Sequence, residues 1–274
     1  MMKYIIIIIL LICLYYCLFT NNEIKNKKNI NSNILPFGYQ YTDLINTACK
    51  KNFYNIINKY GTKKDKKITD KILSIKHKYA PTWGIKIDRN NKIEFEMYFY
   101  VYNPLSRQYE KESITVDKLE KKFNFKSLYN PNITMYSIDY HEKKIIPNFY
   151  YFTSSDNIAD IGYSEKDKKL NNHYYRYFSN TIDNKYEEYI DNKLINYDIK
   201  NIKTVFIADK LIRNYYGIYY DGINYSQLNY FIEKYNFDKK IINEFDEKAH
   251  YSISVDYDKK TKLAVRIGIY GLLY

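Results

Sequence analysis

The sequence predicts an α+β fold in which antiparallel β-hairpins alternate with helices. The clearest observation is the stretch 252–270, where apolar residues occupy every second position on both sides of the polar turn 258–261. Strict alternation of this kind places the apolar residues on one face of a strand. Similar alternating pairs recur at 83–102, 135–152 and 204–220. Between them, apolar residues recur three or four positions apart, which is typical of amphipathic helices.

Helices are expected in the segments that separate the hairpins. Thr42 and Thr69 precede the first two apolar stripes and are predicted N-caps, because a threonine hydroxyl can accept from a free N–H of the first turn. These two helices are expected to end near Tyr60 and Tyr79. Further helices are predicted at 115–123, 164–177, 182–194, 226–235 and 238–245, the last two capped by Ser226 and Asp238.

The hairpins and helices form a repeated unit. Four acidic residues at similar places near the turns mark four such units: Asp88, Asp139, Asp209 and Asp256. Antiparallel pairs that recur between helices imply one larger sheet, either open or closed into a barrel, with the helices covering its outside.

The return strand of each hairpin has two chemically different faces. One is apolar and is expected to pack against helices; on the last strand it consists of Leu263, Val265, Ile267 and Ile269. The opposite faces carry charged and phenolic side chains: Glu94, Glu96, Tyr98, Tyr100, Arg213, Tyr215, Tyr219, Lys262, Arg266 and Tyr270. In an open sheet these side chains would contact water, whereas in a closed barrel they would line a cavity that could hold an anion.

The N-terminus predicts an attachment to a membrane. Residues 4–20 are continuously apolar and close to the ~20 residues that span a bilayer. We therefore expect a signal-anchor at 1–20, a polar tether at 21–35 and a single α+β domain at 36–274. The lysines that follow the apolar segment favour a single-pass protein whose domain faces the cytosol.

The chain is strongly basic, with a formal net charge of +12 and 35 tyrosines. An excess of positive charge suits an anionic small molecule or an anionic lipid. Lysine, isoleucine, asparagine and tyrosine are all over-used, as AT-rich codons would produce, so composition alone accounts for much of this excess. Because the lysines are interleaved with acidic residues and no nucleic-acid-binding module is visible, nucleic acid is not an expected partner.

Several common kinds of site are not predicted. Cys49 is the only cysteine outside the apolar N-terminal segment, which leaves no disulfide framework or zinc spacing in the expected domain. The four histidines are scattered, and no phosphate-binding glycine loop or nucleophile elbow occurs. The sequence therefore predicts no metal site and no bound cofactor.

The repeated helix–hairpin–helix layout, with basic and tyrosine side chains at alternate strand positions over 83–270, resembles the ABBA-type aromatic prenyltransferases. That family has five such units in a barrel, and four are predicted here. The resemblance implies that Arg213, Lys262 and Arg266 bind the diphosphate of a prenyl donor. It implies that five tyrosines shield the allylic cation, with Glu94 or Glu96 as the base for the aromatic acceptor; the tyrosines are Tyr98, Tyr100, Tyr215, Tyr219 and Tyr270.

Two functions from different classes follow from these observations. The first is a membrane-anchored basic protein with a non-catalytic binding or structural role, from an AT-rich virus or protist. The alternative is a prenyltransferase or isoprenoid-diphosphate binder with a tyrosine-lined cavity. The sequence does not decide whether the protein is an enzyme. The discriminating feature is a closed cavity that contains Arg213 and Arg266 together, as opposed to a flat, exposed sheet.

Overall fold

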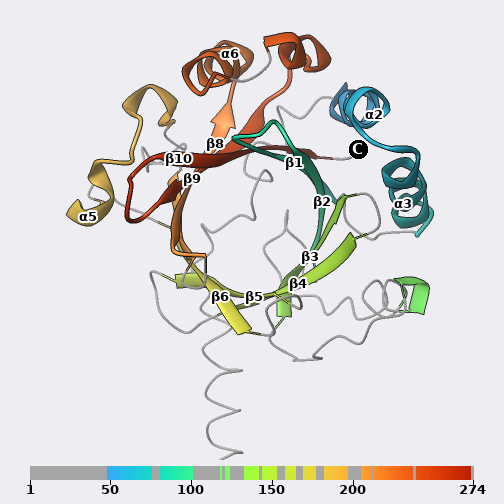
Figure 1. Ribbon diagram of the computed structural model, residues 1–274, viewed down its shortest axis with the longest axis horizontal. Helices are drawn as coiled ribbons and strands as arrows, with labels where there is room; N and C mark the ends of the chain where they lie inside the picture. The colour runs from blue at the N-terminus through green and yellow to red at the C-terminus, as the bar shows by residue number, and fades with distance from the viewer. Residues whose placement is uncertain are drawn as a thin grey trace, which may run out of the picture.

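A closed β-barrel forms the centre of the molecule (Figure 1). The structure is a computed structural model that describes residues 48–75, 81–100, 118, 121–123, 133–141, 144–152, 158–164, 169–176, 182–196, 205–210, 213–236 and 239–272. Within these residues, ten antiparallel strands follow one another around the barrel in chain order, and the first strand pairs with the last. The sequence left an open sheet and a barrel as alternatives, and the structure is a barrel.

The ten strands form five consecutive hairpins. They are β1 (Thr82–Asp88), β2 (Ile93–Tyr100), β3 (Ile133–His141), β4 (Lys144–Phe152), β5 (Ile158–Ser164), β6 (Lys169–Arg176), β7 (Val205–Lys210), β8 (Tyr215–Ile223), β9 (Tyr251–Asp258) and β10 (Ala264–Leu272). The barrel closes through β1 and β10, where Thr82 lies opposite Leu272 and Asp88 opposite Arg266. Closure leaves no strand edge unpaired, which removes a common route to aggregation.

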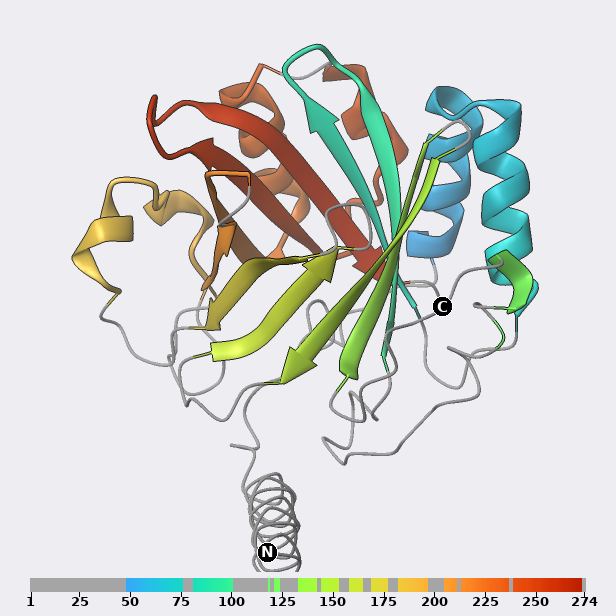
Figure 2. The same cartoon turned by 60° about the horizontal axis from the view of Figure 1, so that its bottom comes forward.

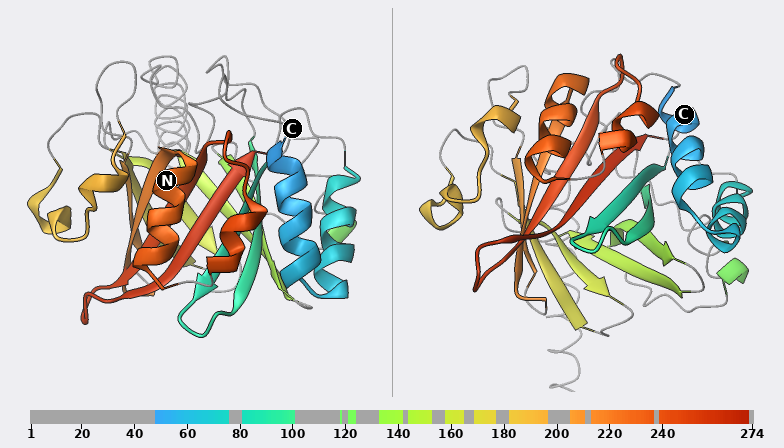
Figure 3. Two further views of the ribbon diagram at one scale, coloured as in Figure 1. Left: turned by 90° about the horizontal axis from the view of Figure 1, so that it is seen from above. Right: turned by 45° about the horizontal axis from the view of Figure 1, so that its top comes forward.

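Helices cover the outside of the barrel (Figures 1 and 3). α2 (Ala48–Tyr60) and α3 (Lys63–Leu73) lie side by side, and α6 (Tyr225–Lys234) and the 3-10 helix η4 (Lys239–Glu244) lie along another part of the wall. Two short pieces, α5 (Asn184–Glu187) and η3 (Asn192–Leu194), replace the longer helix predicted at 182–194. The α+β class with helices outside is therefore confirmed.

The apolar core lies between the barrel wall and these helices. On β1 and β2 the outward positions are Trp83, Ile85, Phe95 and Met97, all fully buried. Phe53 of α2 stacks on Trp83 with ring centroids 5.3 Å apart. The apolar faces predicted for the return strands thus pack against helices, and the opposite faces point into the barrel.

Two predicted helix starts are wrong, one by seven residues and one by two. α3 begins at Lys63, because Thr62 and Asp65 form a capping box in which each side chain accepts from the other's backbone N–H. Thr69, the predicted cap, instead lies buried within the helix, and its hydroxyl contacts the Tyr140 hydroxyl at 2.7 Å. α6 is likewise capped by Asn224, not by Ser226.

The helix predicted at 164–177 is also wrong. This region contains the end of β5 and all of β6. These two strands form the third hairpin along the chain, which the sequence pattern did not predict (Figure 2). β5 pairs with β4 and β6 pairs with β7, so the two strands fill the gap between the second and third predicted hairpins. This pairing provides hydrogen-bond partners for the edges of β4 and β7. Such tertiary contacts can override the local preference of a sequence for helix.

A β-bulge alters the predicted face of the last strand. The pairing of β10 with β9 shifts between Ala264 and Arg266, and a bulge places two residues opposite one. Ile267 and Ile269 are buried on the outer face as predicted, whereas Leu263 is 56% exposed and Val265 lines an internal cavity. The prediction of one apolar face from Leu263 to Ile269 is therefore wrong for its first two members.

Several predictions fall on other parts of the chain. The anchor at 1–20, the tether at 21–35 and the N-cap Thr42 lie outside the described residues, as does most of the helix at 115–123. In the described ranges, no helix has both the length and the apolar character needed to cross a bilayer.

Candidate functional site

Polar and aromatic side chains line the inside of the barrel. The alternation that turns Ile85 and Ile87 outward turns Lys86 inward, and the same rule applies to the paired strands. Strand register then places charged residues beside one another: Lys86 lies opposite Glu94, and Asp256 lies opposite Arg266. The inner wall is therefore a charged surface that residues from distant parts of the sequence build together.

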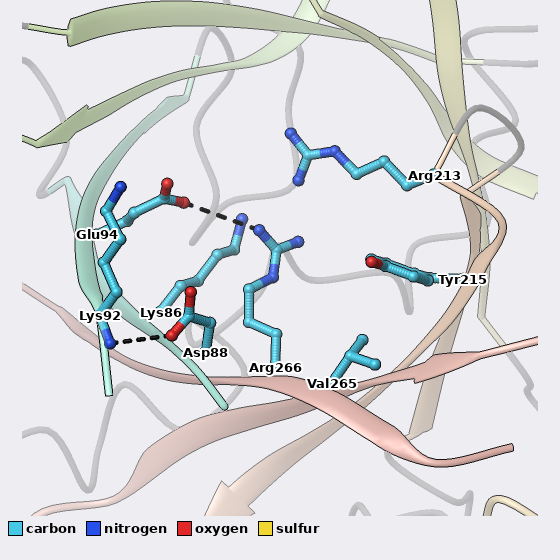
Figure 4. Close-up of a pocket in the computed structure, with 8 residues that line it drawn as sticks. All are labelled: Lys86, Asp88, Lys92, Glu94, Arg213, Tyr215, Val265 and Arg266. Atoms are coloured by element: carbon cyan, nitrogen blue, oxygen red, sulfur yellow. Dashed lines mark hydrogen bonds and ion pairs between the residues drawn. The ribbon is translucent and has the colours of Figure 1, made fainter. Parts of the chain in front are cut away.

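A cavity of about 310 Å³ opens at the end of the barrel where the hairpin turns lie (Figure 4). The β1–β2 and β9–β10 turns project at this same end (Figure 3). Lys86 and Arg266 reach the cavity from the strands, and Arg213 reaches it from the β7–β8 turn. The cavity is lined by Lys86, Asp88, Lys92, Glu94, Arg213, Tyr215, Val265 and Arg266. Four basic side chains against two carboxylates give it a positive excess, which suits an anion.

Arg266 is held in place by acidic neighbours. Its Nε and one terminal nitrogen donate to the same oxygen of Asp256 at 2.8 and 2.6 Å. Its other terminal nitrogen lies 3.9 Å from the Glu94 carboxylate at the cavity rim. A guanidinium fixed in this way is preorganised for further contacts, because its orientation does not have to be found on binding.

A second ion pair joins Lys86 to Glu96 deeper in the barrel. Tyr98 donates its hydroxyl to the other Glu96 oxygen at 2.9 Å. Burial raises the pKa of Glu96, but Lys86, Arg266 and the Tyr98 hydroxyl together outweigh burial and hold that pKa below its usual range. Glu96 is therefore a charged, fully partnered group.

Asp139 of β3 lies directly opposite Glu96 and behaves differently. Burial and the Glu96 carboxylate raise the pKa of Asp139 to about 7, although Lys86 and Arg213 oppose the rise. Ser137 donates to Asp139 at 3.3 Å and accepts from Asn148 at 3.1 Å. Two neighbouring carboxyl groups thus have pKa values pushed apart, which is the usual arrangement where one of them transfers protons.

An aromatic cluster fills the barrel beside these charges. It consists of Tyr98, Tyr150, Phe206, Ala208, Tyr219 and Tyr270, all buried. The Tyr270 ring lies 6.0 Å from that of Tyr98 and 6.3 Å from that of Tyr219. Gly84 makes room for Tyr270, because a Cβ there would lie 2.5 Å from the ring. The inner wall therefore provides π faces close to a cationic mouth.

The structure brings most of the predicted site residues together. Glu94, Arg213, Tyr215 and Arg266 line the cavity, and four more lie inside the barrel: Glu96, Tyr98, Tyr219 and Tyr270. Lys262 does not join them. It lies in the exposed β9–β10 turn and pairs with Glu188 at 2.6 Å, so we leave it out of the site. Tyr100 ends β2, and its side chain lies outside the described structure.

The sequence analysis did not predict several inner residues, among them Lys86, Asp139, Tyr150, Lys210 and Asp256. All but one of these five lie on the first strand of a hairpin, whereas the polar face was predicted on the return strands alone. Asp139 and Asp256 were interpreted as turn markers, yet both lie within strands. Alternation around Ile85 and Ile87 was sufficient to find Lys86. In the described ranges, no three His, Cys, Asp or Glu side chains form a metal-binding group.

A closed antiparallel barrel with helices outside and a cationic mouth is the architecture expected from the resemblance to ABBA-type aromatic prenyltransferases. A search of solved structures returns 5-dimethylallyltryptophan synthase from Streptomyces coelicolor, with a TM-score of 0.52 at 5% sequence identity, covering 86% of this chain and 98% of that one. At this identity the likeness shows a shared fold, and the predicted resemblance is confirmed at that level.

Two further structures are similar over a smaller share of the chain. A 6-dimethylallyltryptophan synthase from Micromonospora olivasterospora, in complex with DMASPP and Trp, gives a TM-score of 0.45 at 7% identity over 70% of this chain and 81% of that one. Another structure, described as 6-dimethylallyl tryptophan synthase, gives 0.43 at 7% identity over 69% and 79%. No family model and no curated protein sequence matches this chain.

These findings correct the first of the two predicted functions. The prediction of a non-catalytic, membrane-anchored structural protein of a virus or protist is contradicted, because the fold is shared with 5-dimethylallyltryptophan synthase and the barrel mouth is a cavity instead of a flat sheet. The predicted single-pass membrane location has no support in the described ranges, where no helix is able to cross a membrane; the predicted anchor at 1–20 lies outside them.

Proposed function

We propose that this protein binds an isoprenoid diphosphate at the mouth of its barrel and transfers the prenyl group to an aromatic acceptor. One observation carries the proposal: a cationic cavity containing both Arg213 and Arg266 lies next to a buried cluster of tyrosine rings. The shared fold with 5-dimethylallyltryptophan synthase supports it. DMASPP and Trp, bound in a structure of lower similarity, indicate which ligands to test first.

Arg266, Arg213 and Lys86 are the proposed diphosphate ligands. Guanidinium groups bind phosphate oxygens through paired N–H donors, and lysine adds a compact positive charge. These groups reach the cavity from β10, the β7–β8 turn and β1. Converging on one anion from three sides, they would also stabilise the negative charge that develops on the leaving diphosphate.

The tyrosine rings are the proposed walls for the prenyl group. As the bond between the allylic carbon and the diphosphate oxygen breaks, its electron pair leaves with the diphosphate and an allylic cation remains. The faces of aromatic rings attract such a cation and keep water away from it. We propose Tyr98, Tyr219 and Tyr270 for this role, because all three are buried in one aromatic cluster inside the barrel. Tyr98 donates to Glu96, the partner of Lys86, and the Tyr219 ring lies 5.4 Å from the Lys210 ammonium.

The last step needs a group that accepts the ring proton after the acceptor carbon has bonded to the prenyl cation. Glu94 and Glu96 were the predicted bases. Glu96 is already paired with Lys86 and Tyr98, and Glu94 lies at the rim with 45% of its side chain exposed. Asp139 fits this role better, since it faces the lumen and its raised pKa of about 7 suits proton transfer near neutral pH.

The experiment incubates the full chain with dimethylallyl diphosphate and tryptophan and measures prenylated product by mass spectrometry. Wild type is expected to form product, and Arg266→Met is expected to lose about 10- to 100-fold in kcat/KM, as loss of a charged hydrogen-bond donor implies. Lys262→Met is the matched control and should retain activity. If the protein binds the diphosphate but forms no product, its function is to bind an isoprenoid diphosphate without transferring the prenyl group. No binding by wild type would contradict the proposal.

A further inference from the structure

We infer that Asp256 is a positioning residue shared by Arg266 and Lys210, and that binding of a diphosphate at Arg266 makes Lys210 take up a proton. This inference rests on the proposed function, because it concerns the same anion site. It adds a group that touches no ligand but controls how the site responds to pH. The predicted consequence is that affinity depends on pH through a lysine behind the cavity.

The geometry shows one carboxylate between two cations. One oxygen of Asp256 accepts both hydrogen bonds from Arg266, and the other oxygen accepts from Lys210. Arg266 lines the cavity, whereas Lys210 is not among its lining residues and is only 3% exposed. Asp256 is only 2% exposed. A ligand in the cavity can therefore reach Arg266, and Lys210 can respond only through Asp256 or through the electric field.

The backbone leaves room for this arrangement at Gly217. Gly217 lies opposite Asp256 in the strand register. A Cβ at this position would lie 2.9 Å from the Asp256 oxygen and 3.0 Å from Lys210 Cε. Any other residue at this inward position would displace the buried pair, so the space is shaped around Lys210 and Asp256.

Charged side chains of β9, β10 and β1 act on Lys210. Burial lowers the pKa of Lys210 to about 7, and Arg266 and Lys86 lower it too, although Asp256 opposes them. The Tyr219 ring of β8 lies 5.4 Å from the ammonium. Asp256 itself stays ionised, because Lys210 and Arg266 hold its pKa well below its usual range despite burial. Other titratable or charged side chains that line the cavity or face the lumen include Asp88, Lys92, Glu94, Glu96, Asp139, Arg213 and Asp221.

The direction of the proton follows from these charges. In the free protein, near-neutral pH leaves a large share of Lys210 uncharged, and Arg266 supplies the positive partner of Asp256. A diphosphate attracts Arg266 and adds negative charge that opposes the repulsion from Arg266 and Lys86. Both changes favour the charged form of Lys210, which then becomes the partner of Asp256. Binding therefore takes up a proton.

Isothermal titration calorimetry tests this with the full chain and dimethylallyl diphosphate in buffers of different ionisation enthalpy. At about pH 8 the ligand should exchange little proton itself, because the last pKa of a phosphate ester is about 6. The slope of binding enthalpy against buffer enthalpy gives the protons exchanged. The wild-type protein should take up more than half a proton for each ligand bound. The Lys210→Met variant should still bind the ligand but take up much less.

Two further variants test whether the proton uptake is specific to Lys210. Lys262→Met removes an exposed lysine with its own carboxylate partner, and its uptake should match wild type. Asp139→Asn removes a second lumen-facing group whose pKa lies near neutral pH, and most of the uptake should remain. Uptake that survives Lys210→Met but disappears in Asp139→Asn would overturn the inference.

Asp256 variants separate positioning from simple structural support. Asp256→Asn should weaken binding and abolish the coupling to pH, whereas Asp256→Glu should partly restore both. Wild-type binding without proton uptake contradicts this inference alone. Absence of binding contradicts the proposed function and the inference with it, so the two failures are distinguishable.

Discussion

The two faces of the same barrel wall differ in chemistry. On β1, Trp83 and Ile85 point outward into an apolar layer, while Lys86 points inward to a carboxylate. The outer layer contains stacked rings such as Phe53 on Trp83. The inner face instead contains paired charges and buried phenol rings, with a cavity at one end of the barrel.

This contrast predicts that outward-facing residues contribute mainly to stability, whereas inward-facing residues contribute mainly to ligand binding. Burial of apolar area on the outer face is non-directional and tolerates exchange of similar side chains. The inner face depends on specific pairs, each of which leaves an uncompensated charge if one partner is removed. Changes at neighbouring positions of one strand should therefore have different consequences.

The largest effect on stability is expected from Trp83→Ala on the outer face. Trp83 is fully buried between Phe53 and Phe245, and such truncations cost about 3–5 kcal/mol. Urea denaturation should show this loss, and the folded fraction should keep its diphosphate affinity. A loss below about 1 kcal/mol would contradict the assignment of the core to the outer face.

Lys86→Met should also be costly, but for an electrostatic reason. It leaves the buried Glu96 carboxylate without its main partner, which typically costs about 3 kcal/mol or more. Since Lys86 helps to lower the Glu96 pKa, this stabilisation is present above the ordinary pKa of 4.5 and is lost as pH falls further. Unfolding free energies of Lys86→Met, Glu96→Gln and the double variant should give a coupling term at pH 7 that fades in acid.

Asp139→Asn should change stability in the opposite direction. Because the folded-state pKa of Asp139 is raised from 3.8 to about 7, the native protein binds more protons than the unfolded chain between these values. Ionised Asp139 therefore costs stability as pH rises through this window. The variant should gain roughly 3–4 kcal/mol on wild type at pH 8 relative to pH 4, because each unit of pKa shift is worth about 1.4 kcal/mol, and chemical denaturation at the two pH values measures this. An equal effect at both values would contradict a raised pKa.

The smallest effect is expected from Lys262→Ala. Its partner Glu188 is exposed, and surface ion pairs contribute little. Thermal melting and diphosphate binding should both stay at wild-type values within error. A clear loss of diphosphate binding would show that Lys262 belongs to the binding site, contrary to its position in the exposed β9–β10 turn.

Local alternation was sufficient to predict four of the five hairpins. The pairs at 83–102, 135–152, 204–220 and 252–270 all occur as hairpins, since each alternates apolar and polar residues. β5 and β6 were missed because Leu170 to Tyr175 lacks such a pattern, and these strands depend on the edges of β4 and β7. Barrel closure depends on β1 meeting β10, a long-range contact that no local pattern encodes.

The site was predictable only where alternation continued without interruption. Tyr219, Arg266 and Tyr270 were found because they lie at even spacing on return strands. Lys262 shares that spacing with Arg266, yet a positive φ of 59° at Lys262 and the bulge after Ala264 break the strand between them. The contacts that Asp256 makes with Lys210 and Arg266 join three strands, and only the structure could reveal them.

The central claim is that the inner face binds an isoprenoid diphosphate while the outer face holds the fold together. The most direct measurement is the thermal shift of residues 1–274 with dimethylallyl diphosphate and with pyrophosphate, beside an Arg213→Ala/Arg266→Ala double variant. We expect the prenyl compound to raise the Tm of wild type, more than pyrophosphate does, and to leave the double variant unchanged. Equal shifts in both proteins, or none in wild type, would contradict the claim.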